Sequence, residues 1–223
     1  MCGRFSLTRS DRDDIEGEFG VPVPEEHRPR YNIAPTQEVL VLLSDGGVRR
    51  MEAFRWGLIP SWAKDPRIGH KLINARAETL FEKPSFRSAA RGRRCLVLAD
   101  GFYEWRTTAK GKVPVYIRLK SKRPFGFAGL WESWTSPEGR TVKTCAIVTT
   151  HANELMKPIH ERMPVIVPKE MEATWLSPEI QAEKDLKEIL QPYPAEQMET
   201  YEVLRLVNSP GNDLPECVEP LGI

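Results

Sequence analysis

The chain has 223 residues, of which 40% are hydrophobic and 28% are charged, a composition typical of a globular protein that can bury a sizeable core. It contains no apolar run near the roughly 18 residues of a membrane span, and no apolar stretch follows a basic start. We therefore expect one domain over residues 1–223, located in the cytoplasm, without a signal peptide or membrane anchor.

Charge is distributed unevenly along the chain, although the formal net charge is only +1. Residues 1–170 hold 29 basic and 20 acidic side chains, a balance of +9, whereas residues 171–223 hold 3 and 11, a balance of −8. The basic part permits an anionic partner, although solvated surface charge gives the same pattern. Residues 208–223 are expected to form an acidic C-terminal tail.

The first elements are predicted from turn residues and hydrophobic spacing. A capping Thr or Ser, early acids and a final Gly predict a short helix over 9–19. The proline-rich stretch 21–36 predicts an irregular loop. Residues 38–43 and 48–58 predict a β-hairpin, because the SDGG between them supplies a glycine pair for the turn.

Strands dominate the middle of the chain, and the segments predicted to form them are 94–105, 113–120, 125–133, 142–150, 163–167 and 201–207. Helical segments are expected at 78–92, with a break at Pro84, and at 169–176. A last helix is expected over 178–190, with Ser177 as its cap and Pro178 at its first position. The order lacks a regular βαβ alternation, which favours an α+β fold.

The spacing of cysteines and histidines predicts neither a metal site nor a cofactor. No C-x-x-C or H-x-x-x-H pattern links the cysteines at 2, 95, 145 and 217 or the histidines at 27, 70, 151 and 160. Cys95 and Cys145 lie in apolar, strand-like runs and are expected to be buried. Cys2 has no such run around it.

Cys2 becomes chemically distinctive if Met1 is removed, as expected for a chain whose second residue is small. A terminal cysteine carries a thiol and a free α-amine, with reference pKa values of roughly 8.5 and roughly 8. The amine can serve as the base for acyl transfer by the thiol. Alternatively, the amine condenses with an aldehyde and the thiol closes a thiazolidine ring.

Three later segments, LINARAET, LADGFYEWR and KPIHERMP, place polar side chains in apolar surroundings. If the first is extended, Asn74 and Arg76 lie on one face. Glu104 and His160, from the other two, are natural proton carriers, and arginines on extended segments suit a phosphate or carboxylate. Taken singly, each residue is also consistent with an ordinary surface or hydrogen-bonding role.

Six segments in order, MCGRF, RYNIAPT, WGLIPSW, INARAET, ADGFYEW and IHERMP, closely resemble the SOS-response-associated peptidase (SRAP) family, from Cys2 to about Asn208. That family recognises abasic sites in single-stranded DNA. The resemblance implies a single α+β domain with a mixed, mostly antiparallel, curved or barrel-like sheet and peripheral helices. It also implies a thiazolidine crosslink between Cys2 and the aldehyde of an abasic deoxyribose. The peptidase of the family name is then removal of the protein's own first residue.

The resemblance also implies roles for four catalytic residues. Cys2 is the nucleophile, and Asn74 holds its amine and the sugar. Glu104 is the proton shuttle that keeps the amine neutral. His160 is the acid or base that opens the sugar and assists reversal of the crosslink.

Six further residues are implied to contact DNA, namely Arg4, Pro35, Trp62, Arg76, Trp105 and Arg162. The three arginines would hold phosphates, which supplies affinity without sequence preference. Pro35 and Trp62 would form an apolar edge against which the strand bends or stacks. The implied partner is single-stranded DNA containing an abasic site, bound by a monomer that associates with the nucleoid when on DNA and not with a membrane.

Two other functions remain open from the sequence. N-terminal-nucleophile glutamine amidotransferases also begin with Met-Cys-Gly and use the cysteine for acyl transfer. However, no segment resembles their Asn-His-Gly glutamine-binding region. A non-catalytic single-stranded-DNA-binding module is the second alternative, and it would bind DNA equally well without the Cys2 thiol.

Overall fold

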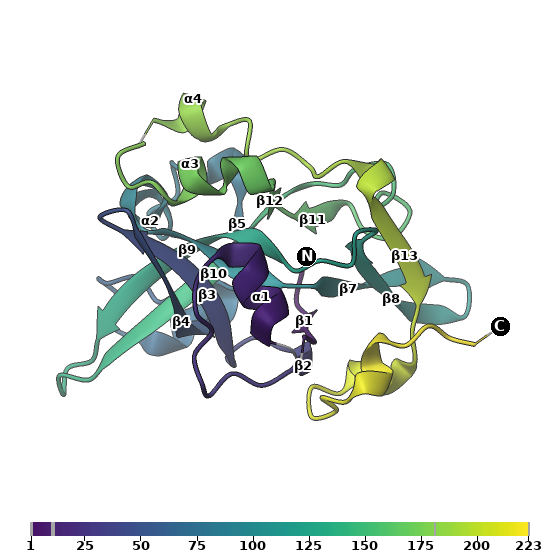
Figure 1. The fold of residues 1–223 in the computed structure, drawn as a ribbon. Coiled ribbons are helices and arrows are strands. Elements are labelled where there is room, and N and C mark those ends of the chain that lie inside the picture. The colour runs from purple at the N-terminus through teal and green to yellow at the C-terminus, as the bar shows by residue number, and fades with distance from the viewer. Residues whose placement is uncertain (1, 10–11, 181, 223) are drawn as a thin grey trace.

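The computed structural model describes residues 2–9, 12–180 and 182–222, and it is built from two β-sheets with short helices around them (Figure 1). Met1, whose removal the sequence predicts, lies outside the described residues. Among the helices that the structure describes, none is long and apolar enough to cross a membrane. The α+β architecture expected from the sequence is confirmed.

The first sheet has eight strands: β3 (Glu38–Asp45), β4 (Val48–Trp56), β5 (Asn74–Arg76), β6 (Arg94–Ala99), β9 (Phe125–Thr135), β10 (Thr141–His151), β11 (Arg162–Pro164) and β12 (Ile166–Val167). β10 pairs with β4 and also with β9, so the strands β10, β4, β3, β6 and β9 close into a ring. Only the β10–β4 pairing in this ring is parallel. The expected barrel-like, mostly antiparallel sheet is therefore present.

The second sheet is antiparallel and has the order β13-β8-β7-β1-β2: β13 (Met198–Glu202), β8 (Gly111–Leu119), β7 (Gly101–Thr108), β1 (Phe5–Leu7) and β2 (Arg30–Ile33). Phe5 joins the two sheets, since its ring contacts Trp56 and Phe127 with centroid separations of 5.1 and 5.8 Å. All three side chains are fully buried. This aromatic contact fixes the N-terminal segment against the ring of strands.

The described residues form four short α-helices at the periphery: α1 (Arg12–Phe19), α2 (Arg87–Gly92), α3 (Glu172–Leu176) and α4 (Glu183–Leu186). Short segments of 3₁₀-helix occur at Pro66–Lys71, Ala77–Thr79, Lys169–Met171, Ala195–Gln197, Arg205–Asn208 and Pro215–Val218. In Figure 1, α1 lies in front of the sheets and α3 and α4 lie at the top.

The predicted hairpin is confirmed in full register from Glu38↔Arg55 to Asp45↔Val48. Gly46 and Gly47 form its turn with φ values of 55° and 84°, a conformation that glycine adopts without steric penalty. Cys95 and Cys145 are fully buried in β6 and β10, as their apolar surroundings predicted. The conditional expectation that LINARAET is extended at Asn74–Arg76 is also met, because those residues form β5.

The single strand predicted over 94–105 is wrong, because Asp100 divides it into β6 and β7 in different sheets. The buried Asp100 carboxylate accepts hydrogen bonds from the Ser6 hydroxyl and from the Thr8 amide and hydroxyl. These bonds satisfy the carboxylate where the chain changes sheets. The predicted strand 163–167 is likewise divided, at Val165, into β11 and β12.

The predicted helix over 178–190 is reduced to α4, and residue 181 of that segment lies outside the described residues. Ser177 ends α3 instead of starting the next helix, because its amide donates to the Ala173 carbonyl oxygen. Its own carbonyl accepts from the buried Arg94 side chain. The helix predicted over 169–176 is present as a 3₁₀ turn followed by α3.

Three other predicted boundaries need correction. The loop predicted over 21–36 contains β2. In the helical segment predicted over 78–92, only α2 and the end of the 3₁₀ segment Ala77–Thr79 are helical. The strand predicted over 201–207 is β13, which begins at Met198 and ends at Glu202. The helix predicted over 9–19 is α1, although residues 10 and 11 lie outside the described residues.

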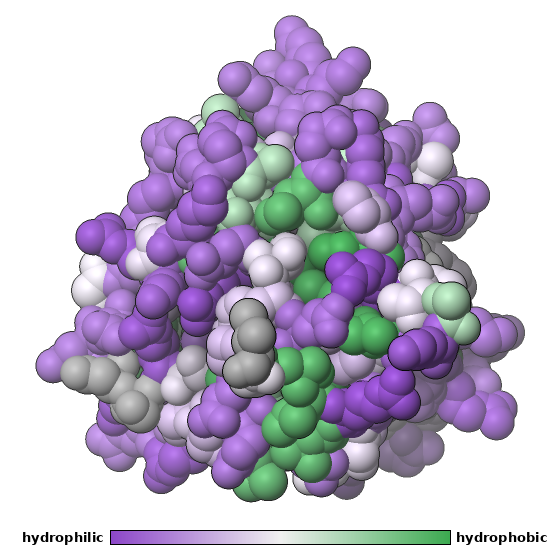
Figure 2. All heavy atoms as spheres, turned by 90° about the vertical axis from the view of Figure 1, so that its right-hand side faces the viewer, coloured by the Kyte–Doolittle hydropathy of each residue, from purple (hydrophilic) through white to green (hydrophobic). Residues whose placement is uncertain are grey.

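Residues 203–220, the C-terminal segment, fold back onto the second sheet (Figure 1). Its buried residues Val203, Val207 and Cys217 pack with Tyr103 and Tyr116. Figure 2 shows the side of the molecule that carries β13 and this segment as mainly hydrophilic, with hydrophobic residues gathered along its middle. The extent of the single domain and of the acidic tail stays a prediction.

Candidate active site at the N-terminal segment

Two hydrogen bonds to the carbonyl oxygens of Cys2 and Arg4 hold the N-terminal segment between the two sheets. The Asn74 side-chain amide nitrogen donates to the Cys2 carbonyl oxygen at 2.8 Å, which links the segment to β5. The Tyr103 amide donates to the Arg4 carbonyl oxygen at 2.9 Å, which links it to β7. With Phe5 anchored in the core, these bonds leave Cys2 little freedom.

The Cys2 thiol is fully buried, although the sequence around it contains no apolar run. Burial raises the pKa of the Cys2 thiol far above its ordinary value, and the negative charge of Glu104 raises that pKa further. A weak contact from Sγ to the Arg4 carbonyl oxygen at 3.9 Å acts in the opposite direction. The thiol is therefore protonated at neutral pH, a form that is a poor nucleophile.

Glu104 lies on the same face of β7 as Phe102, since side chains alternate along a strand. This face is turned toward the core, and only 4% of the Glu104 side chain is exposed. The adjacent Tyr103 and Trp105 pack instead toward the C-terminal segment. The β-strand thus brings a carboxylate to the Cys2 side of the sheet.

Glu104 and His160 line one cleft of about 430 Å³ together with Trp105, Lys112 and Asn208. The cleft therefore brings together a carboxylate and an imidazole that are 56 residues apart in the sequence. These are the two side chains that sequence analysis identified as proton carriers. The structure brings both to one solvent-accessible hollow.

The orientation of His160 is set by its neighbour on β11. The Arg162 backbone amide donates to His160 Nδ1 at 2.9 Å. Because Nδ1 accepts this bond, a neutral imidazole carries its proton on Nε2. His160 can then donate from Nε2 as an acid, or accept a proton there after losing the first.

Arg162 is an ion-pair partner of Glu78, and both terminal nitrogens of its guanidinium reach that carboxylate. Nη2 also donates to the Thr149 carbonyl oxygen at 2.6 Å. A phosphate that binds Arg162 must therefore compete with Glu78 for these donors. Arg76 lies opposite Thr149 in the β5–β10 pairing and is exposed, and its side chain makes no hydrogen bond or ion pair with another described residue.

Arg4 is half-buried and is held by the protein itself. Its Nη1 donates to Asn32 Oδ1 at 2.7 Å and to the Val207 carbonyl oxygen at 2.6 Å, and its guanidinium lies 5.7 Å from the centre of the Trp105 ring. Burial lowers the pKa of Arg4. These contacts order Trp105 at the cleft and leave fewer Arg4 donors for a phosphate.

Pro35 and Trp62 are not brought to this cleft by any contact of the described residues. Pro35 is partly exposed and precedes Thr36, which has a positive φ of 76°. Trp62 is 59% exposed, so it is a surface tryptophan and not part of the core. Both remain predicted DNA-binding residues on the strength of the motif alone.

Three polar residues at the site were not identified from the sequence. Glu78 stands within INARAET, but nothing in that motif indicates its ion pair with Arg162. Lys112 and Asn208 lie outside every motif and reach the cleft through the β7–β8 pairing and the folding back of the C-terminal segment. Only the tertiary structure places these last two residues at the cleft.

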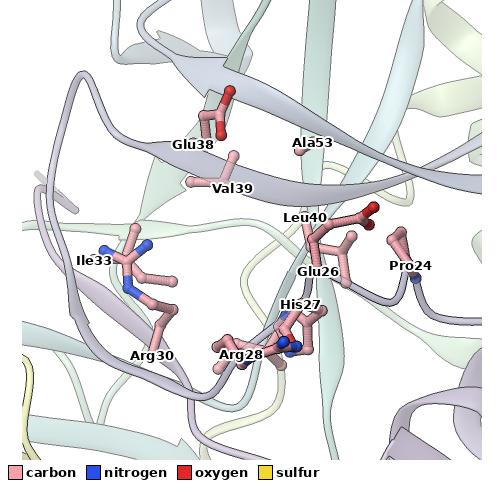
Figure 3. Close-up of a pocket in the computed structure, with 11 residues that line it drawn as sticks. Pro24, Glu26, His27, Arg28, Arg30, Ile33, Glu38, Val39, Leu40 and Ala53 are labelled. Atoms are coloured by element: carbon pink, nitrogen blue, oxygen red, sulfur yellow. The ribbon is translucent and has the colours of Figure 1, made fainter.

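A separate pocket has a volume of about 440 Å³ (Figure 3). Its lining comes from the 24–28 loop, β1, β2 and the β3–β4 hairpin, and it includes none of the predicted site residues. The pKa of His27 there is lowered by burial and by neighbouring arginines. Within residues 2–9, 12–180 and 182–222, no group of three or more His, Cys, Asp or Glu side chains is placed to hold a metal ion.

Relatives of this chain carry a consistent name. An abasic site processing protein of Bacillus subtilis, YoqW, is 52% identical, and the alignment covers 98% of this chain and 99% of that protein. The abasic site processing protein HMCES of Xenopus tropicalis is 32% identical, with 98% of this chain and 78% of that protein covered. A crystal structure of a Bacteroides thetaiotaomicron protein superposes with a TM-score of 0.89 at 28% identity, covering 99% of this chain and 100% of that one.

The sequence profile of one family matches residues 1–210, and its description is SOS response associated peptidase (SRAP). The match includes every predicted site residue, from Cys2 to Arg162. The match supports the family that the six motifs resemble, and not the amidotransferase class. The chain belongs to the SOS response associated peptidase family.

Proposed function

We propose that this protein processes abasic sites in single-stranded DNA by forming a covalent bond through Cys2. The observation that carries the proposal is the position of Cys2, whose carbonyl binds the Asn74 side chain and whose thiol lies within the electrostatic influence of Glu104. Relatives over nearly the whole chain are named abasic site processing proteins, which supports the same substrate. The protein would act in the cytoplasm, as a monomer bound to nucleoid DNA.

The reaction starts with loss of Met1, because only then is the Cys2 nitrogen a free amine. An amide nitrogen shares its lone pair with the carbonyl and cannot form an imine. In the peptidase step that we propose, the Cys2 thiol adds to the Met1 carbonyl carbon, the C–N bond breaks, and the thiol proton goes to the nitrogen. Water then hydrolyses the resulting thioester, which releases methionine and restores the thiol. A methionine aminopeptidase would give the same product.

The free amine then attacks the aldehyde of the ring-opened abasic sugar, and one water leaves as the imine forms. His160 transfers a proton to or from the sugar as its ring opens, and Glu104 accepts a proton from the amine. The thiol next adds across the C=N bond, so that sulfur bonds to carbon and the thiol proton goes to nitrogen. A protonated thiol can take this second step because the electrophile is already attached beside it.

Denaturing electrophoresis of the protein with single-stranded DNA containing one abasic site tests this proposal. We expect an adduct whose mass equals protein without Met1 plus DNA minus one water. Cys2→Ser should lose the thiazolidine, while borohydride reduction should still trap some imine. A heat-labile, non-covalent complex alone would contradict the crosslinking mechanism.

An N-terminal extension distinguishes the amine from the thiol. With an uncleavable extension ahead of Cys2 the protein should fold and bind single-stranded DNA but form no crosslink, and a cleavable extension should restore crosslinking when cleavage leaves Cys2 first. The control is DNA binding measured in parallel on the same preparations. Undiminished crosslinking by the blocked protein would mean that Cys2 acts as a plain thiol.

A further inference from the structure

Two polar residues of the cleft have no part in the chemistry above. Lys112 lies on β8, and Asn208 is the last residue of the 3₁₀ turn Arg205–Asn208. Both are exposed. The Lys112 ammonium and the Asn208 amide nitrogen make no hydrogen bond or ion pair with another residue that the structure describes. They are therefore available to a ligand in the cleft.

The amide of Asn208 is oriented by Trp105. The Trp105 indole nitrogen donates to Asn208 Oδ1 at 2.7 Å. An indole N–H can only donate, so the bonded atom must be the amide oxygen and the other branch must be the NH₂ group. The NH₂ group, with two protons to donate, is left for whatever occupies the cleft.

The backbone around Asn208 is held on both sides by one buried side chain. Asn32 Nδ2 donates to the carbonyl oxygens of Val207 at 3.2 Å and Ser209 at 2.9 Å. Asn32 itself is fully buried. A donor held in this way loses little conformational freedom when a ligand binds, which strengthens its contribution to affinity.

Lys112 supplies positive charge to the same cleft. It lies opposite Thr107 in the β7–β8 hairpin, two residues along from the Trp105↔Pro114 pair. The cleft therefore carries a cation and an oriented amide donor beside Glu104 and His160. Among the groups of a nucleic acid, a phosphodiester oxygen is the acceptor that both of these donors favour.

We propose that Asn208 and Lys112 bind the phosphodiester that adjoins the abasic nucleotide. This inference rests on the proposed function, because it assumes that a DNA strand occupies the cleft. The two residues fix the strand relative to Glu104 and His160 and leave the bond-forming steps to other groups. They are substrate-contact residues, and neither carries a proton in the reaction.

Asn208→Asp tests the amide, because its carboxylate still accepts from the Trp105 indole while the two donated protons are lost. We expect roughly 10-fold weaker binding of an abasic single strand, measured by fluorescence anisotropy at fixed salt. Tryptophan emission and thermal stability should stay as in the wild type.

Lys112→Met tests the charge through the salt dependence of binding. When a protein neutralises one phosphate fewer on a single strand, the slope of log K against log[salt] falls in magnitude by about 0.7. Lys110→Met is the matched control, since Lys110 is an exposed lysine of the same hairpin that does not line the cleft. We expect the slope to fall in Lys112→Met and to stay unchanged in Lys110→Met.

Wild-type affinity in Asn208→Asp, or equal slopes in the two lysine variants, would overturn the inference. A loss of affinity in Asn208→Asp together with altered tryptophan emission would also count against it, because the effect would then come from Trp105. These outcomes are separable from failure of the proposed function, because the wild-type protein itself would then form no crosslink.

Discussion

At the scale of single residues, the burial of Cys2 explains how an easily oxidised side chain can stand at the start of a chain. Oxidation and attack on an electrophile from solution both proceed through the thiolate. Burial and the nearby Glu104 raise the pKa of the Cys2 thiol, so the thiolate is scarce in the DNA-free protein. In the crosslinking steps that we propose, sulfur reacts only after the amine has captured the aldehyde, when the electrophile is already attached beside it.

Glu104→Gln should slow crosslinking while leaving DNA binding nearly unchanged, because it removes a proton acceptor and keeps the shape of the side chain. We expect at least a 10²-fold loss in the rate per bound complex, as is typical of general acid–base groups. The Cys2 thiol should also titrate at lower pH, since one cause of its raised pKa is gone. Single-turnover crosslinking with DNA binding measured in parallel checks the rate and the affinity.

The result that would refute this role is a Glu104→Gln protein that no longer binds DNA but retains the wild-type rate per bound complex. Thr107→Val, on the same strand but exposed, is a suitable control for changes in β7 itself. It should bind and crosslink as the wild type does.

The ion pair of Glu78 and Arg162 gives a pH-dependent contribution to stability. Hydrogen bonding from Arg162 lowers the pKa of Glu78 below its ordinary value. The stabilisation is therefore fully present above the unfolded pKa of about 4.3 and is lost as pH falls through the lower, folded pKa. Glu78→Gln should be less stable than wild type by about 0.5 kcal/mol at pH 7, since the carboxylate is half-exposed.

The measurement is chemical denaturation of both proteins at pH 7 and near pH 3. We expect the difference in unfolding free energy between them to disappear at the lower pH. Glu82→Gln makes the same change of charge at an exposed glutamate without an ion pair to another described residue, and it should show no such difference. An equal loss at both pH values would mean that Glu78 stabilises the fold by packing instead.

The sequence identified candidate site residues more readily than it identified their neighbours in the folded protein. The motifs identified Asn74, Glu104 and His160, and the structure places each near Cys2 or in the cleft. Nothing in the sequence indicated that Cys2 is buried, because its contacts come from strands about 70 and 100 residues away. The position of Asn208 in the cleft could not be predicted for the same reason, since its neighbours there are distant in the sequence.

At the scale of elements, strands were predicted well and their ends were not. The glycine pair and the two segments that flank it located the β3–β4 hairpin correctly, because this signal is local. The change of sheet at Asp100 depends on hydrogen bonds from Ser6 and Thr8, which lie in a different part of the sequence. A continuous apolar run carries no sign of such a change.

The WGLIPSW segment depends on a close approach of two backbones. A Cβ on Gly57 would lie 2.8 Å from the Gly69 carbonyl oxygen, and Gly57 has a φ of 128° that L-residues rarely adopt. We expect Gly57→Ala to lower the free energy of unfolding by roughly 2 to 4 kcal/mol, through both the steric clash and the strain. Thermal or urea denaturation followed by circular dichroism checks this value.

Gly92→Ala is the matched control, since a Cβ at that position in α2 would meet nothing within 4 Å. It should leave stability unchanged or raise it by up to about 1 kcal/mol, because alanine is the better helix former. If the two substitutions had equal effects, the close approach at Gly57 would not be what requires glycine there.

At the scale of the whole molecule, the acidic part of the chain is built into the fold near the basic part. The C-terminal segment packs on β2 and β8, and the Val207 carbonyl holds Arg4. Asp213 accepts from the amides of Tyr31 and Asn32 and forms an ion pair with Arg30. The Asp213 carboxylate thus anchors the segment that carries Asn208, in addition to contributing negative charge that repels DNA.

Asp213→Ala and Glu216→Ala separate anchoring from charge, because each removes one negative charge from the same segment. Glu216 is exposed and makes no hydrogen bond or ion pair with another described residue. Asp213→Ala leaves two backbone amides and the Arg30 Nε without their acceptor, so we expect a loss of about 2 to 3 kcal/mol in unfolding free energy and weaker DNA binding. Glu216→Ala should keep wild-type stability and bind DNA equally well or slightly better.

Denaturation curves and DNA titrations of both variants provide the comparison. If both variants instead bound DNA more tightly to the same extent, with stability unchanged, the acidic segment would act through its charge alone.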